Sequence, residues 1–150
     1  MIYLDHAATV ALCPEALEAM LPFLTEQYGN PSALYESGRR ARQALAAARK
    51  SLAETLGCLP EELYFTSGGT EANNWALLAM AEAARERGDK PFLVATEIEH
   101  HAVLETLRYG KKAGVLEFAL LPVSREGRAD LGAAKALLQQ RPALVSCMGA

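Results

Sequence analysis

The second half of the chain alternates short apolar runs with segments whose apolar residues recur every three or four positions. The apolar runs at 92–95, 115–123 and 143–148 are typical of buried strands, and the segments 101–113 and 130–140 between them are typical of helices. Strands that alternate with helices form βαβ units around a mostly parallel sheet. The pattern therefore predicts an α/β fold with right-handed crossovers.

The first half of the chain is predicted to be mainly helical. The expected elements are helices at 14–27, about 38–56 and about 71–86, a loop at 29–38, and one short strand at Leu63–Thr66. Two residues mark helix boundaries by their chemistry. Gly57 suits the left-handed position that ends a helix, and Asp130 suits an N-cap.

Composition and charge narrow the classes of function. The chain has 150 residues and a net charge of −3, which does not favour a nucleic-acid partner. No apolar run approaches the roughly 20 residues that cross a bilayer, and the first residues do not resemble a signal peptide. Three cysteines stand far apart without a metal-binding spacing, so we expect no disulfide framework and a cytoplasmic protein.

The first candidate for chemistry is the turn Ser67-Gly68-Gly69-Thr70-Glu71, between the predicted strand and a helix. Two glycines let the backbone approach a ligand closely, and the N–H groups of the first helical turn lack internal partners. A phosphate fits such a helix N-terminus. The spacing alone also fits a plain strand–helix turn in which Ser67 or Thr70 caps the helix.

The second candidate is Glu97-Ile98-Glu99-His100-His101, which follows the predicted strand at 92–95. Site residues gather at the carboxyl ends of strands in this architecture, and a histidine there is suited to stack on a planar ligand or to move protons. A surface histidine pair is the ordinary alternative. His101 and Glu105 lie four residues apart, but no third ligand of matching type is nearby, so no metal site is predicted.

Two further segments, Leu4-Asp5-His6-Ala7-Ala8-Thr9 and Gly29-Asn30-Pro31-Ser32, indicate little by themselves. Read in order with the two candidates above, they resemble the N-terminal part of the NifS/IscS-type cysteine desulfurases, in the class V aminotransferase group of pyridoxal-phosphate enzymes. The resemblance covers essentially all 150 residues. It implies the first part of the large domain of a fold type I transferase, incomplete and without a complete second domain.

The resemblance implies roles for residues that match the family's motifs. Gly69 and Thr70 match positions that bind the phosphate of pyridoxal 5'-phosphate. His100 matches the histidine that stacks on the pyridine ring and takes part in proton transfer. His6, Ala7 and Thr9 are expected near the substrate end of the site.

The chain also departs from the family pattern. Val10-Ala11 stand where Thr-Pro is usual, Tyr35 where a histidine is common, and Gly149 where histidine or alanine often follows Met148. The Schiff-base lysine and the nucleophilic cysteine of the family match no residue here. We therefore expect the N-terminal portion of a longer enzyme, inactive alone, because the residues that make bonds are missing.

The implied reaction is the removal of sulfur from L-cysteine, giving L-alanine and an enzyme persulfide. The implied partners are a sulfur acceptor, such as an iron–sulfur scaffold protein, and a second subunit in a homodimer. Selenocysteine lyase, another class V aminotransferase and a non-catalytic remnant remain as alternatives.

Overall fold

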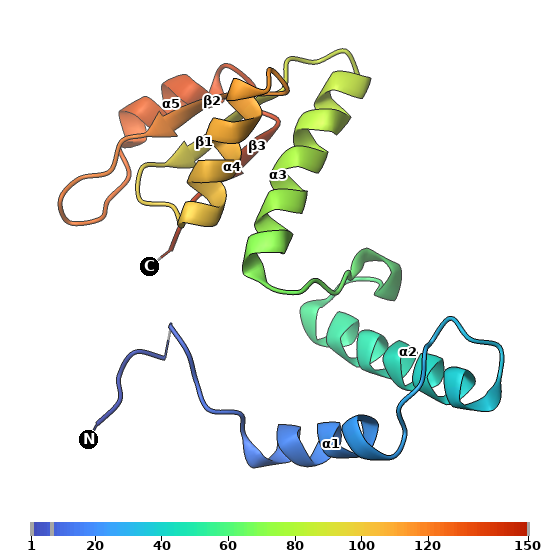
Figure 1. Cartoon of the computed structure of the whole chain (residues 1–150). Helices are drawn as coiled ribbons and strands as arrows, with labels where there is room; N and C mark the ends of the chain where they lie inside the picture. The colour runs from blue at the N-terminus through green and yellow to red at the C-terminus, as the bar shows by residue number, and fades with distance from the viewer. Residues whose placement is uncertain (1, 7, 150) are drawn as a thin grey trace. The chain divides into compact units, whose positions relative to one another are not determined.

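The computed structural model describes residues 2–6 and 8–149, and they form two compact units that divide between Tyr64 and Phe65. Figure 1 follows the chain from the helical N-terminal unit to the unit that contains the sheet. Each unit is described by itself. Within the described residues, no helix is both long and apolar enough to cross a membrane.

The regular elements described in the N-terminal unit are helices. They are α1 (Pro14–Thr25), α2 (Glu36–Leu56) and the short 3-10 helix η1 (Pro60–Glu62). Pro14 begins α1, where its missing N–H costs nothing, and Gly57 ends α2 with φ 71°, the left-handed conformation expected there. None of the residues of α1 is buried, so the unit has little core of its own.

The loop before α2 contacts the first turn of that helix. A β-carbon at Gly38 would lie 2.5 Å from the Ala33 carbonyl oxygen, and one at Gly29 would lie 2.5 Å from the Ser37 carbonyl oxygen. These backbones approach so closely that only glycine fits at either position. The helix starts at Glu36, two residues before the predicted position 38, and its first turn packs against the loop that precedes it.

Over its described residues, 65–149, the sheet unit has three parallel strands in the order β2-β1-β3. They are β1 (Phe92–Thr96), β2 (Glu117–Leu121) and β3 (Leu144–Ser146). In the register, Leu93 lies between Phe118 and Leu144. All of β1 is buried, as expected for the central strand of a parallel sheet.

Helices cover both faces of this sheet. They are α3 (Gly69–Glu86), α4 (His101–Lys112) and α5 (Leu131–Leu138). One core cluster joins α3 and α4 to Leu93 and Ala95, and the other joins α5 to Phe92 and Val94. Because alternate residues of a strand point to opposite faces, α3 and α4 lie on one face and α5 lies on the other.

The two crossovers run in opposite directions. The connection through α4 leads from β1 to one neighbour on one face, and the connection through α5 leads past β1 to the other neighbour on the opposite face. The two connections differ both in their direction across the sheet and in the face on which their helix lies, so they have the same handedness. This agrees with the rule that parallel crossovers are right-handed. The α/β class and the parallel sheet predicted from the sequence are thus confirmed.

One predicted element is wrong. Among the described residues, 63–66 pair with no strand, although Leu63 is extended with φ −100° and ψ 122°. The Arg49 side chain donates a hydrogen bond to the Leu63 carbonyl, so this carbonyl does not serve a strand ladder. The other boundaries differ from prediction by a few residues, and Asp130 caps α5 as expected.

Candidate active site

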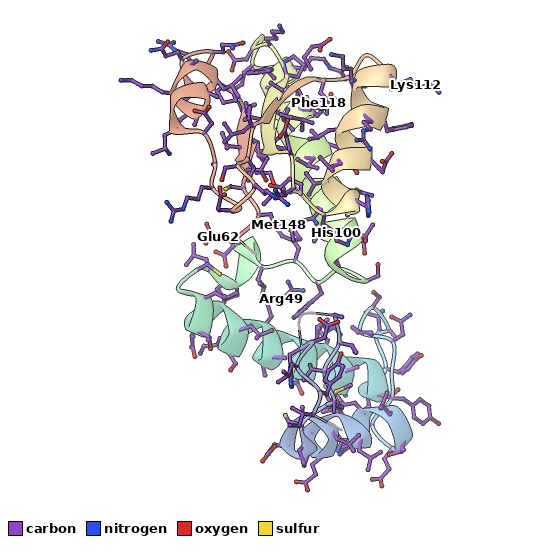
Figure 2. All side chains as sticks on the ribbon, turned by 90° about the vertical axis from the view of Figure 1, so that its left-hand side faces the viewer. Arg49, Glu62, His100, Lys112, Phe118 and Met148 are labelled. Carbon is purple, nitrogen blue, oxygen red and sulfur yellow. The ribbon has the colours of Figure 1, made fainter. Side chains whose placement is uncertain are left out.

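The carboxyl edge of the sheet carries the candidate site. Because the strands are parallel, Thr96, Leu121 and Ser146 end at the same edge. Figure 2 shows His100 and Met148 at one end of the sheet unit and Lys112 at the other. In open α/β sheets, ligands bind outside the carboxyl ends of the strands, especially where the crossovers diverge to opposite faces.

The glycine turn leads directly into α3. Gly68 is extended, with φ 161° and ψ 179°, and its carbonyl accepts the first helical hydrogen bond, from Ala72 N at 3.1 Å. The N–H groups of Gly69 and Thr70 precede that bond and have no intrahelical acceptor. A β-carbon at Gly68 or Gly69 would meet nothing within 4 Å, so the turn is open to an approaching group.

Glu71 fastens the other side of this turn. Its Oε2 accepts hydrogen bonds from Ser67 N at 2.6 Å and Ser67 Oγ at 2.7 Å. The bond from the Ser67 hydroxyl, and then the bond from the Ser67 N–H, lower the pKa of the exposed Glu71 carboxyl. The residue at the N-cap position is Gly68, so the alternative of a cap by Ser67 or Thr70 is wrong.

His100 stands at the N-cap of α4, where the chain turns from β1 into the helix. Its Nδ1 accepts a hydrogen bond from Ala102 N at 3.1 Å. Since Nδ1 acts as the acceptor, the neutral ring carries its proton on Nε2. The side chain is exposed, and its ring makes an edge contact with His101 at 6.2 Å between centroids. The N-cap bond therefore fixes the imidazole and leaves Nε2 for a ligand.

Glu99 lies in the segment 97–101, but the sequence predicts no role for it. The residue is 9% exposed, and its carboxylate accepts three hydrogen bonds: from Thr96 Oγ1 at 2.7 Å, from Met148 N at 2.8 Å and from Ser146 Oγ at 2.9 Å. These partners come from the end of β1 and from the end of β3 and the segment after it. Glu99 therefore holds the backbone immediately before His100 against the neighbouring strand.

A second polar contact sets α3 against α4. The Thr106 hydroxyl contacts the Asn74 side-chain oxygen and lies 2.8 Å from the Ala102 carbonyl oxygen. Asn74 is five residues after the start of α3, and Thr106 is five residues after the start of α4.

The two helices run side by side, as Figure 1 shows, and both lead back from the carboxyl edge of the sheet. Because the two contacting residues are equally far from the starts of their helices, the N-termini of α3 and α4 lie at the same height along the helix axes. The axes of helices in contact are about 8–10 Å apart. The glycine turn and His100 are thus brought to one place.

The N-terminal candidates belong to the other unit. The Tyr3 hydroxyl lies 2.7 Å from the Asp5 carbonyl oxygen and 3.1 Å from the Thr9 carbonyl oxygen, and the Tyr3 and His6 rings are 5.4 Å apart. His6 and Thr9 are exposed, and Ala7 lies outside the described residues. These contacts define a local turn in the N-terminal unit.

Comparisons with protein families, curated proteins and solved structures all indicate the same family for this chain. The family model described as aminotransferase class-V matches residues 2–150. A curated relative, cysteine desulfurase IscS from Dictyoglomus turgidum, is 43% identical over 149 residues, which are 99% of this chain and 37% of the relative. The chain thus spans little more than a third of that relative's length.

Solved structures similar to this chain indicate the same family. A NifS-like protein superposes with a TM-score of 0.89 at 37% identity over 99% of this chain and 40% of its own. A structure titled SspA in complex with cysteine gives a TM-score of 0.72 at 34% identity over 81% of this chain and 34% of its own. The class-V aminotransferase and NifS-like families use pyridoxal phosphate as cofactor. The resemblance drawn from the four motifs is therefore confirmed, and the chain belongs to the class-V aminotransferase family.

Proposed function

We propose that this chain forms the cofactor-phosphate and ring-facing part of a pyridoxal-phosphate-dependent cysteine desulfurase. The observation that carries the proposal is the level pairing of two helix N-termini, one beginning at the open glycine turn and the other at His100. In the full-length enzyme, residues 1–150 would make up the N-terminal segment and the first part of the large domain.

The turn before α3 suits the phosphate of the cofactor. The N–H groups of Gly69 and Thr70 and the Thr70 hydroxyl are the donors that we assign to it, and the positive end of the helix dipole favours an anion there. Open space at Gly68 and Gly69 admits the phosphate oxygens. Glu71 brings a negative charge to the same turn, but its carboxylate is engaged by Ser67.

His100 is suited to the cofactor ring. Its Nδ1 is held by Ala102 N, so the imidazole plane is fixed and Nε2 is the atom that we assign to proton exchange with the bound reactants. When bound, pyridoxal phosphate supplies an electron sink for negative charge at the substrate's α-carbon. Glu99 keeps His100 in place by its three hydrogen bonds.

The proposed reaction transfers sulfur from L-cysteine to an enzyme thiol and leaves L-alanine. Support comes from the relatives named cysteine desulfurase and from the cysteine complex of SspA. We further propose that His6, Ala7 and Thr9 line the substrate end, that the enzyme acts as a homodimer, and that the sulfur passes to an iron–sulfur scaffold protein. The free cysteines at 13, 58 and 147 suit the reducing cytoplasm.

Cofactor binding is tested first, with the chain and pyridoxal phosphate. We expect saturable quenching of the fluorescence of Trp75, the single tryptophan. Thr70→Val should weaken binding roughly tenfold, because a hydrogen bond to a charged group is lost. Thr55→Val, on α2, is the matched control and should change nothing. Equal affinities of the two variants would contradict the assignment of the phosphate to this turn.

Activity is tested in a chimaera in which this chain replaces the matching N-terminal part of the Dictyoglomus turgidum relative. We expect sulfide and alanine from L-cysteine, and a loss of turnover on His100→Ala that the matched variant His101→Ala does not show. Preference for selenocysteine, or transfer of the amino group to an α-keto acid, would assign the site to another member of the family.

A further inference from the structure

A hollow lies at the amino edge of the sheet, where the strands begin, opposite the candidate site. Its volume is about 520 Å³, within the range of small-molecule pockets. It is formed by the connection from α3 to β1 and the connection from α5 to β3. The lining residues are Arg87, Asp89, Lys90, Gln140, Arg141, Pro142 and Ala143.

The strand order explains why these two connections meet. β1 and β3 are parallel neighbours, so the segments that precede them arrive side by side at the amino edge. The Ala143 N–H donates a hydrogen bond to the Phe92 carbonyl at 2.7 Å and joins the two segments where the strands start. The parallel pairing of β1 and β3 therefore holds together the two loops that line the cavity.

The cavity has an excess of positive charge. Arg87, Lys90 and Arg141 supply three cations, and Asp89 supplies one carboxylate, in a chain whose net charge is −3. Asp89 is engaged by Arg87, with 3.2 Å between Nε and Oδ2. Lys90 lies 5.9 Å from the centre of the Phe92 ring, and neither Lys90 nor Arg141 forms a salt bridge within the described parts of the chain.

Arg141 occupies a position where a charged residue is uncommon. Its φ is 55°, in the left-handed region that glycine or asparagine usually fills after a helix, and it is the one residue other than glycine with positive φ among the described residues. Its N–H donates a hydrogen bond to the Leu138 carbonyl oxygen at 3.0 Å, which closes the end of α5. A glycine there would close the helix equally well without placing a guanidinium on the cavity wall.

The C-termini of α3 and α5 lie beside this cavity, and basic side chains compensate their partial negative charge. That ordinary role needs nearby cations but no hollow and no anion from solution. Binding measurements distinguish this role from a ligand site. Replacing a basic residue that only compensates a helix C-terminus changes the stability of the protein but not its affinity for an anion.

We propose that this cavity binds a small anion that carries two or more phosphate or carboxylate groups. Lys90 and Arg141 bring unpaired charge from the two connections, and Arg87 adds a third cation whose charge Asp89 partly offsets. Such a ligand bridges the starts of β1 and β3. The site lies across the sheet from the glycine turn and does not depend on the proposed desulfurase activity.

The test uses the whole chain with inorganic pyrophosphate as the probe, followed by isothermal titration calorimetry and amide chemical shifts in NMR spectra. We expect one saturable site whose affinity falls with added NaCl and whose shift changes map to residues 87–90, 139–141 and 143. Shift changes confined to Gly69 and Thr70, or no saturable binding, would overturn the proposal.

Charge variants sharpen the result. Lys90→Gln and Arg141→Gln should each weaken pyrophosphate binding about tenfold, from the loss of one charge-assisted hydrogen bond. Asp89→Asn should tighten binding, since it removes the opposing carboxylate and frees Arg87. Arg125→Gln, which removes one charge from an exposed loop of the same unit, is the matched control. An equal effect from Arg125→Gln would reduce the binding to net charge alone and refute a built site.

Discussion

Replacing Glu99 by alanine removes the carboxylate that joins the end of β1 to the segment after β3. Three donors then lose their acceptor, namely the hydroxyls of Thr96 and Ser146 and the N–H of Met148, which lie at 2.7, 2.9 and 2.8 Å. A donor left unsatisfied costs about 1–3 kcal/mol when it is buried, as the Thr96 hydroxyl is, and less at the part-buried donors of Ser146 and Met148. Since the cost of burying the carboxylate is recovered at the same time, we expect a net loss of about 3 kcal/mol in the free energy of unfolding.

Glu99→Gln is the informative companion. The glutamine oxygen can still accept from Thr96 and Met148, and the Ser146 hydroxyl can turn to accept from the new amide. Only the charge assistance is lost, so the expected cost is about 1 kcal/mol.

The assay is urea unfolding at pH 7, followed by the fluorescence of Trp75 and by circular dichroism. Glu97→Ala, two residues away and exposed, serves as the control and should stay within about 0.5 kcal/mol of the parent. The reasoning fails if Glu99→Ala is as mild as this control, or if Glu99→Gln costs as much as Glu99→Ala.

Three other changes test separate features of the sheet unit. Asp130→Ala should cost about 1 kcal/mol in urea unfolding, because its Oδ1 caps two N–H groups at the start of α5, while Asp130→Asn should retain most of that stability. Gly110→Ala should destabilise the unit by about 1 kcal/mol despite the better helix propensity of alanine, since the new β-carbon would lie 2.6 Å from Leu116 Cδ2, and a more stable variant would contradict this close approach. Ser67→Ala should raise the pKa of Glu71 toward its ordinary value in a carbon-13 NMR titration, because the largest cause of its lowering is gone. The lowered pKa means that the ionised carboxylate stabilises the folded turn above the ordinary pKa and that this contribution is lost as the pH falls through the lowered value, so an unchanged titration in Ser67→Ala would refute the bond.

Local chemistry made part of this fold predictable from sequence. The run at 92–95 is apolar at every position because β1 is buried on both faces, and Gly57 and Asp130 satisfy helix ends by rules that need only their neighbours. Leu63–Thr66 also consists of strand-forming residues, but no strand among the described residues pairs with it. Pairing depends on what lies across the sheet, and a four-residue run carries no information about that.

The candidate site shows the same division. Gly69, Thr70 and His100 can be proposed from the sequence because they lie in short motifs whose order is typical of a family. The role of Glu99 depends on Ser146 and Met148, which are 47 and 49 residues away along the chain. One sequence does not reveal such distant partners, although a charged residue three positions after an apolar strand is a usable signal.

The position of β1 at the centre of the sheet has a consequence for how the chain is made. β1 leaves the ribosome before both of its neighbours, so its two hydrogen-bonding edges stay bare until β2 and then β3 follow. Until then the Glu99 carboxylate also lacks the hydrogen bonds from Ser146 and Met148. A nascent chain that stalls before residue 144 therefore exposes an apolar strand with one open edge, a species suited to capture by a chaperone or to association with other unfinished chains.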